Sequence, residues 1–337
     1  MLDYIVKGEM MSKSEWRKKL NGISVSLPTF NNEVYELELS KTKKHVSWLI
    51  EQGLNAENSV LFIAGGLGEG YFLDDFEWEA MANALVEVVD GRISTGIGVF
   101  ELSARTAAKK AAYATNLGMD FIQCAPPRYM QPTEDEIFEH YKYISDNSDI
   151  GIMAYNTPWR MPGGYNFSAG LIERFLDIEN FVGLKWSSTS VQHYINMIRL
   201  FSKNINFISN GSVMSIGYKL GATGFTDFLV NVAPRLSLHK LQLIKEKRFD
   251  EFDELELKMN IDPPLRYAKT GSLSVGGMGE GPGARLRLES LGMDSGPHFP
   301  SQVAFPEEYI NAYKQTVKDS GIADWVDWED KIFNLQN

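Results

Sequence analysis

An α/β fold, specifically a closed (β/α)8 barrel with a C-terminal helical extension, is the fold class that the sequence predicts. Between about residues 23 and 229, short apolar runs rich in β-forming residues alternate with amphipathic helical segments. Such alternation is typical of parallel strands joined by crossover helices. The runs number eight, which matches a closed barrel better than an open sheet.

Each predicted strand is a run of three to seven residues followed by a turn or a polar segment. The eight predicted strands are Ile23–Leu27, Val60–Ala64, Ile93–Val99, Phe121–Ala125, Gly151–Tyr155, Val182–Trp186, Phe207–Ser209 and Gly224–Phe228. The helices between them are predicted from their ends. Asp74 and Thr133 each stand three residues before a glutamate, which is the capping-box spacing, and Ser168 and Ser190 are further candidate caps.

The strand signals end near Pro234, and two consecutive helices are predicted over residues 236–247 and 249–259. Glycine- and proline-rich segments follow at 276–283 and 296–300. We interpret them as irregular surface loops rather than a phosphate cradle, because no Gly-Lys-Ser/Thr follows. Another helix is predicted from Pro306 onward. The predicted organisation is an N-terminal segment (1–20), the barrel (21–247) and a C-terminal helical region (248–337).

The composition indicates an ordinary globular protein and excludes several function classes. The 337 residues are 44% hydrophobic, and the formal net charge of -11 argues against a general nucleic-acid binder, which needs a dense basic surface. The single cysteine, Cys124, lies in a predicted strand and is expected to be a packed thiol. Without a signal-like N-terminus or a long apolar run, we expect a cytoplasmic protein with no membrane span.

Lys185 is the most informative candidate for chemistry, because it stands near the end of an otherwise apolar strand. In a (β/α)8 barrel the active site lies at the carboxyl ends of the strands. A buried lysine either pairs with a carboxylate, for which Asp227 is a candidate, or loses its proton and becomes a nucleophile. Substantial deprotonation at pH 7 requires the pKa to fall by about three units, or about 4 kcal/mol.

Three other strand ends carry residues that suit imine chemistry. Tyr155 is either a core aromatic or, one strand before Lys185, a general acid/base. The glycine loop at 65–70 is either a tight turn or a place where backbone N–H groups meet an anion. Arg160 is either a surface residue or a clamp for a substrate carboxylate. The histidines show no metal-ligand spacing, and no Gly-x-Ser-x-Gly elbow follows a strand.

Taken together, these strand ends resemble the dihydrodipicolinate synthase and N-acetylneuraminate lyase family of Schiff-base-forming barrels. The resemblance extends over residues 22–252. It is carried by four segments in order: Leu27-Pro28-Thr29-Phe30, Gly65-Gly66-Leu67-Gly68-Glu69, Tyr155-Asn156-Thr157-Pro158, and Gly183-Leu184-Lys185 with Ser187-Ser188 following.

The resemblance implies a class I lyase whose Lys185 attacks the ketone carbon of a 2-oxo acid, pyruvate or a keto-deoxy sugar acid. Tyr155 would move protons, and the backbone of Gly66 and Leu67 would bind the substrate carboxylate. Tyr129 matches a second tyrosine contributed across a subunit interface, and Arg160 matches an arginine that holds the second substrate. The family implies a homo-oligomer, a dimer or tetramer, and no metal or organic cofactor.

Several positions depart from the synthase pattern. Synthase relatives carry two threonines where this chain has Gly66 and Leu67, and leucine cannot relay a proton. The loop is more similar to the branch that dehydrates and decarboxylates 5-dehydro-4-deoxyglucarate. Trp186 replaces an acid but should face away from Lys185. Many relatives have a small or hydroxyl residue at the position of Asp227. We expect Asp227 to contact polar groups of the substrate.

The reaction type is therefore open among aldol cleavage, condensation and dehydration. Two alternatives of other kinds remain. One is a non-catalytic barrel that binds a carboxylated metabolite, which the missing hydroxyl at Leu67 favours. The other is a metal-dependent aldolase, which should lose activity to chelators.

Overall fold

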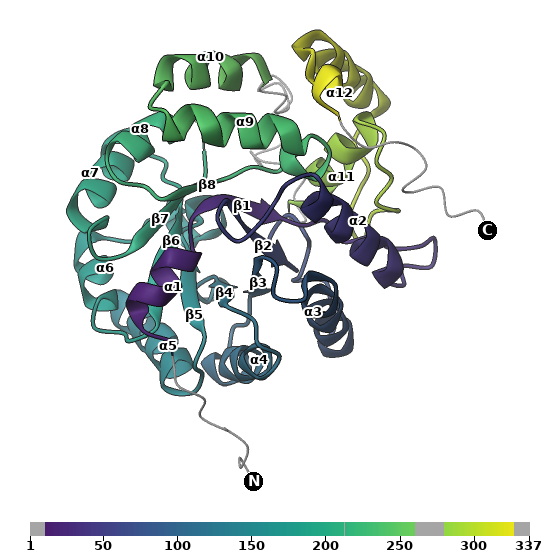
Figure 1. Ribbon diagram of the computed structural model, residues 1–337. Helices are drawn as coiled ribbons and strands as arrows, with labels where there is room; N and C mark the ends of the chain where they lie inside the picture. Colours follow the sequence, from purple (N-terminus) through teal and green to yellow (C-terminus); the bar gives the residue numbers. More distant parts are fainter. Residues whose placement is uncertain (1–10, 212, 260–279, 327–337) are drawn as a thin grey trace.

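The eight predicted strands close into one parallel barrel in chain order, as the computed structural model shows (Figure 1). The structure describes residues 11–211, 213–259 and 280–326. The (β/α)8 prediction is confirmed, and each observed strand overlaps its predicted run. The strands are β1 (Gly22–Ser26), β2 (Ser59–Ile63), β3 (Ser94–Val99), β4 (Phe121–Cys124), β5 (Gly151–Tyr155), β6 (Phe181–Trp186), β7 (Asn206–Ser209) and β8 (Gly224–Thr226).

Helices surround the strands, and their starts confirm the predicted caps. Asp74 and Thr133 form complete capping boxes, and the hydroxyls of Ser168 and Ser190 each accept a backbone N–H of the first turn. The surrounding helices are α2 (Leu39–Glu51), α3 (Asp75–Val89), α4 (Ala104–Asn116), α5 (Glu134–Asp146), α6 (Ala169–Phe175), α7 (Val191–Phe201), α8 (Met214–Lys219) and α9 (Pro234–Lys245).

The amino end of the barrel is closed by the N-terminal helix α1 (Lys13–Lys19), which lies across the strands in Figure 1. Its Trp16, together with Leu20, packs against inward-facing strand residues such as Phe62 and Phe121. Along each strand, the side chains that alternate with these inward-facing residues belong to the larger core that packs against the helices. Alternation of the strand side chains thus separates an inner from an outer core.

Where the structure describes it, the C-terminal region contains α10 (Phe249–Met259), α11 (Gly281–Ser290), α12 (Glu307–Ser320) and a short 3-10 helix (Ile322–Trp325). In Figure 1, α11 and α12 lie beside the barrel near α2. A second hydrophobic cluster joins them to the end of the barrel; it includes Phe228, Leu236, Leu288 and Tyr313. The predicted boundaries at residues 20/21 and 247/248 fall between elements, and the domain division stays a prediction.

The interpretation of 276–283 as a surface loop is wrong where the structure describes it. Residues 276–279 lie outside the described residues, but Gly281, Pro282 and Gly283 form the buried first turn of α11. Proline suits that turn because the first helical N–H groups have no partner inside the helix. Glycine is required at 281, because a Cβ there would lie 1.6 Å from a carboxylate oxygen of Glu69.

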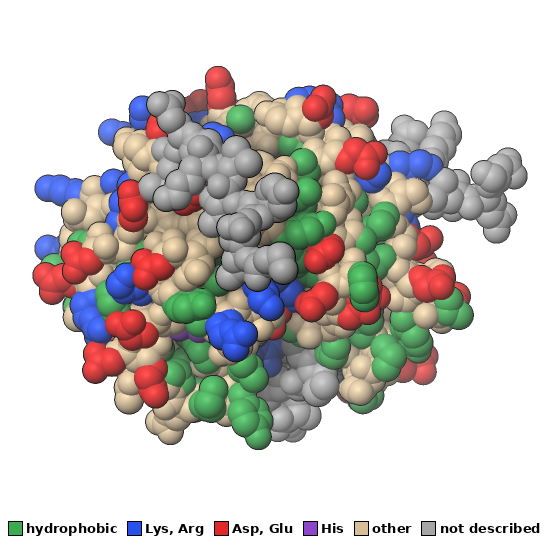
Figure 2. Space-filling model, turned by 90° about the horizontal axis from the view of Figure 1, so that it is seen from below, with side chains coloured by type: hydrophobic (Ala, Val, Ile, Leu, Met, Phe, Trp, Pro, Cys, Tyr) green, Lys and Arg blue, Asp and Glu red, His purple; other side chains and the backbone are tan. Residues whose placement is uncertain are grey.

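The surface carries charges of both signs. On the face shown in Figure 2, basic and acidic side chains are interspersed rather than gathered into one basic surface. Among the described helices, none has the length and apolar character that a membrane crossing requires.

Candidate active site

Strands β5 and β6 place Tyr155 and Lys185 side by side at the carboxyl end of the barrel. The two residues are Cα partners in the strand register, and the Lys185 ammonium lies 4.3 Å from the centroid of the Tyr155 ring. Both side chains are buried. Leu184 and Trp186 belong to the outer core, so Lys185 faces the barrel interior and Trp186 points away from it, as alternation predicts.

Burial lowers the pKa of Lys185 to about 8, while the carboxylate of Glu280 acts in the opposite direction. About a tenth of the lysine is therefore neutral at pH 7, because each unit between pH and pKa is a factor of ten. Asp227 does not pair with it: its carboxylate lies 3.1 Å from Lys240 Nζ. Over the described ranges of the chain, Lys185 forms no ion pair, which leaves its amine available as a nucleophile.

Tyr155 is held as a neutral phenol. Burial raises its pKa well above the usual value and Glu280 adds to the effect, while Asn210, Arg128 and Arg160 oppose it. A protonated phenol beside a partly neutral amine can donate a proton to an oxygen that develops negative charge.

The glycine loop turns tightly and leaves backbone donors free, so its two interpretations are compatible. Ala64 has a positive φ of 51°, which is uncommon for a residue with a Cβ and which strained functional sites often contain. A Cβ at Gly68 would lie 2.4 Å from the carbonyl oxygen of Leu27, so the turn requires glycine there. Within the part of the chain that the structure describes, the backbone N–H groups of Gly66 and Leu67 donate no hydrogen bond.

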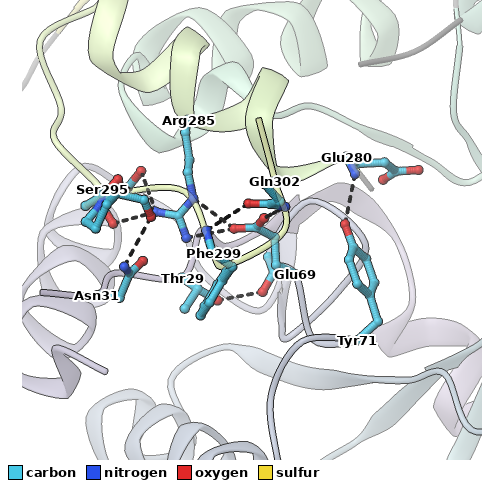
Figure 3. Close-up of polar contacts among 12 residues, drawn as sticks. Thr29, Asn31, Glu69, Tyr71, Glu280, Arg285, Ser295, Phe299 and Gln302 are labelled. Atoms are coloured by element: carbon cyan, nitrogen blue, oxygen red, sulfur yellow. Dashed lines mark hydrogen bonds and ion pairs between the residues drawn. The ribbon is translucent and has the colours of Figure 1, made fainter. Parts of the chain in front are cut away.

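A buried ion pair fastens the C-terminal region to this loop (Figure 3). The guanidinium of Arg285 on α11 lies 2.7 Å from the carboxylate of Glu69, and Gln302 donates to the same carboxylate at 2.6 Å. Arg285 also donates to the carbonyl oxygen of Ser295 at 2.8 Å. These contacts hold α11 against the loop that follows β2.

Breaking that pair should destabilise the fold. Arg285→Leu would leave the Glu69 carboxylate buried without its cation, and we expect the free energy of unfolding to fall by about 3–5 kcal/mol. Urea denaturation followed by tryptophan fluorescence measures the change. As a control, Arg248→Leu removes an arginine from exposed ion pairs with Glu246 and Glu251 and should leave the midpoint close to that of the unmodified protein. Equal midpoints for all three proteins would contradict the assignment.

Helix α11 begins next to Glu280, which lies over the glycine loop and was not predicted from the sequence. The backbone N–H of Glu280 donates to the Tyr71 hydroxyl at 2.8 Å, as Figure 3 shows. Its carboxylate accepts a hydrogen bond from Trp159 Nε1 at 3.4 Å. The other carboxylate oxygen lies 2.6 Å from where a Cβ on Gly66 would be. The loop therefore holds glycine where this carboxylate approaches.

Two arginines, like Glu280, interact electrostatically with Tyr155. Arg160, at the end of the short 3-10 helix Pro158–Arg160, is partly buried, and its Nη2 has no hydrogen-bond partner within the described ranges. Arg128, after β4, lies over the ring of Phe100 at 5.3 Å and interacts electrostatically with both Glu280 and Arg160. The site thus offers two guanidinium groups to an anionic ligand, of which only Arg160 was predicted.

Two of the predicted site residues are not brought into this cluster. Tyr129 is 86% exposed on the single chain, so its proposed role across an interface stays a prediction. Asp227 accepts hydrogen bonds from Ser237 and from the Leu229 backbone in addition to its ion pair with Lys240. These contacts give Asp227 a structural role, and its predicted contact with substrate remains untested. The side chain of Leu67 is partly buried and packs against the C-terminal cluster.

Among the described residues, no group of three or more His, Cys, Asp or Glu side chains is arranged to hold a metal ion. Cys124 is a buried thiol whose pKa burial raises to about 12, which confirms the expectation of a packed thiol.

The class of protein that fold and site define is a (β/α)8 barrel with a lysine-centred site at the carboxyl ends of its strands.

Comparison with known proteins identifies the family. The model of the dihydrodipicolinate synthetase family matches residues 19–262. The chain therefore belongs to this family, and it is an enzyme of the lyase class. It is 29% identical over 306 residues to 4-hydroxy-tetrahydrodipicolinate synthase of Thermotoga maritima, covering 89% of this chain and 98% of that protein. The synthase of Methanococcus maripaludis is 24% identical over 256 residues, covering 75% and 83% of the two chains.

Solved structures share the fold. A crystal structure of dihydrodipicolinate synthase from Thermotoga maritima has a TM-score of 0.76 at 22% identity and covers 90% of this chain and 99% of its own. A chloride-inhibited dihydrodipicolinate synthase from Acinetobacter baumannii, complexed with pyruvate, has a TM-score of 0.74 at 23% identity and covers 90% and 99%. At these identities the likeness concerns the barrel and its extension.

Proposed function

We propose that this protein is a class I lyase that forms a Schiff base between Lys185 and a 2-oxo acid. The observation that supports it most is the buried Lys185 amine, whose pKa is lowered to about 8 and which lies 4.3 Å from the ring of Tyr155. That the Acinetobacter relative was crystallised with pyruvate makes pyruvate the first 2-oxo acid to test.

The proposed reaction begins when the neutral Lys185 amine attacks the ketone carbon. The C=O π pair moves to oxygen, which takes a proton from the Tyr155 phenol, and the resulting phenolate takes a proton from the nitrogen to give a neutral carbinolamine. Tyr155 then protonates the hydroxyl as it leaves as water, which gives a protonated imine and a phenolate. This cation withdraws electrons, so the adjacent carbon can lose a proton or a carbon fragment. Cleavage, condensation and dehydration all start from this step.

The remaining residues are assigned by their positions. The free N–H groups of Gly66 and Leu67 would hold the carboxylate next to the ketone, as backbone donors do for anions. Arg160 and Arg128 would hold a second anionic group farther out in the mouth. The family resemblance further suggests a homo-oligomer in which Tyr129 crosses an interface.

Borohydride trapping tests the proposal. The folded protein is incubated with pyruvate or with keto-deoxy sugar acids, reduced, and digested for mass spectrometry. We expect a stable adduct on Lys185. Absence of an adduct with every 2-oxo acid tried would overturn the proposal, and ligand-dependent thermal shifts without an adduct would support the non-catalytic binding barrel instead.

Glu280 should control the pH at which trapping proceeds. Its carboxylate favours the ammonium form and raises the pKa of Lys185, so Glu280→Gln should lower that pKa below about 8. The rate of trapping by pyruvate between pH 6 and 9 should then rise at a lower pH than in the unmodified protein. The glutamine can still accept the Trp159 hydrogen bond, which keeps the local contacts.

Glu289→Gln is the matched control, because Glu289 lies exposed on α11 and forms an ion pair with Lys314 at 3.5 Å. Its pH midpoint should equal that of the unmodified protein. A midpoint for Glu280→Gln that also stays unchanged would show that the Glu280 charge does not act on Lys185.

A further inference from the structure

Gln123 lies on the inner face of β4, nearer to the carboxyl end than the inner core. Phe121, two residues before it, packs with Phe62 and Met153 in the inner cluster, whereas Ile122 belongs to the outer core. Because strand side chains alternate, Gln123 faces the same interior as Phe121. Its position two residues farther along the strand brings it one layer closer to the site.

The amide of Gln123 has no hydrogen-bond partner among the residues that the structure describes. Its side chain is buried, with 1% of the residue exposed, and neither Oε1 nor Nε2 is bonded. The large majority of buried polar side chains have a partner, because an unbonded buried donor or acceptor is destabilising. An amide in this state calls for a role that the fold alone does not explain.

The amide reaches the glycine loop. Its Nε2 lies 3.8 Å from the position that a Cβ on Gly65 would occupy. The next two residues, Gly66 and Leu67, carry the backbone N–H groups that donate no hydrogen bond within the described chain. A side-chain donor from β4 and two backbone donors from the loop after β2 therefore converge on one region.

We propose that Gln123 is a substrate-binding residue, whose amide donates a hydrogen bond to the carboxylate of the 2-oxo acid held by Gly66 and Leu67. The inference rests on the proposed function and deepens it. Neither residue 66 nor residue 67 has a hydroxyl to offer an anion. The amide of Gln123 supplies a side-chain donor from a different strand, and a donor to a carboxylate makes a charge-assisted bond.

The test compares Gln123→Leu with the unmodified protein. We measure how adduct formation at Lys185 depends on pyruvate concentration under borohydride, and the melting temperature without ligand. A lost hydrogen bond to a charged group should raise the half-saturating pyruvate concentration on the order of 10- to 100-fold. The melting temperature should stay the same or rise, because a buried amide without a partner has been replaced by an apolar side chain of similar size.

Two further variants make the result decisive. Gln123→Met has an unbranched side chain of similar length and carries the test if leucine does not fit. Gln192→Leu changes an exposed glutamine on α7 that bonds only Asn196 over the described residues, and it should saturate like the unmodified protein. Half-saturation of both Gln123 variants at the unmodified concentration, or a fall in melting temperature with unchanged affinity, would overturn the inference.

The outcomes also separate this inference from the proposed function. If the unmodified protein forms an adduct and the Gln123 variants saturate as it does, only the role of Gln123 is wrong. If the unmodified protein is neither labelled nor thermally stabilised by pyruvate or another 2-oxo acid, the proposed function and the role of Gln123 are both wrong.

Discussion

Lys185→Met is expected to abolish both turnover and borohydride labelling. Methionine is of similar length and fills the same buried space, but it has no amine, so no imine can form. Because Lys185 is buried and makes no ion pair within the described residues, its replacement should leave the melting temperature unchanged or raise it. Activity would therefore be lost without loss of fold, which circular dichroism and thermal melting can verify.

Lys109→Met is the control for this prediction, because Lys109 is an exposed lysine of α4. It should keep full activity and full labelling. An adduct that persists in Lys185→Met would show that another amine carries the chemistry and would remove the basis for the proposed function.

Tyr155→Phe is expected to slow turnover by roughly 10²- to 10⁴-fold, the effect typical of a lost general acid/base. The phenylalanine ring still packs beside Lys185, but the proton donor is gone. Because the substrate carboxylate is assigned to the glycine loop, the change should appear in kcat with little change in KM. Steady-state kinetics with the 2-oxo acid that gives the strongest labelling would measure both.

Tyr141→Phe provides the matched comparison. Tyr141 is also buried, but it lies in the outer core and its hydroxyl donates to the carbonyl oxygen of Cys124 at 2.9 Å. That variant should lose some stability and keep its turnover per folded molecule. A Tyr155→Phe enzyme within about threefold of the unmodified kcat would exclude the phenol as the proton donor.

The barrel could be predicted because its signals are local. Each strand is a short apolar run, and capping residues such as Asp74 and Thr133 mark where the helices begin. The pairing of Tyr155 with Lys185 followed from the same reasoning, because adjacent strand ends meet at one edge of a parallel barrel.

The rest of the site depends on tertiary contacts that have no local signature. Glu280 reaches the glycine loop only because α11 docks there, and its glycine-rich surroundings suggested a loop. Asp227 also ends a strand, but α9 brings Lys240 against it, which no pattern in the sequence indicated. Arg128 and Tyr129 are neighbours in a segment without periodicity, so the sequence could not tell which side chain would turn inward.

Gln123 is a different case, because a signal was present. It stands two residues after Phe121 in a strand whose side chains alternate, so its inward orientation could have been deduced. The sequence pattern predicts Phe121–Ala125 as one buried strand, and the apolar residues on either side of Gln123 dominate that prediction. A polar residue on the inner face of a barrel strand is informative even when it lacks charge.

The ion pair between Glu69 and Arg285 also bears on the order in which the candidate site is assembled during synthesis. The chain emerges from its N-terminus, so the strands that carry Tyr155 and Lys185 are available before α11 exists. Arg285 then has to pair with Glu69, which belongs to a loop far earlier in the sequence. That pairing places Glu280 over the loop. A nascent barrel would thus hold Lys185 without the neighbouring carboxylate of Glu280, and the charge environment of that lysine would be complete only after α11 has docked.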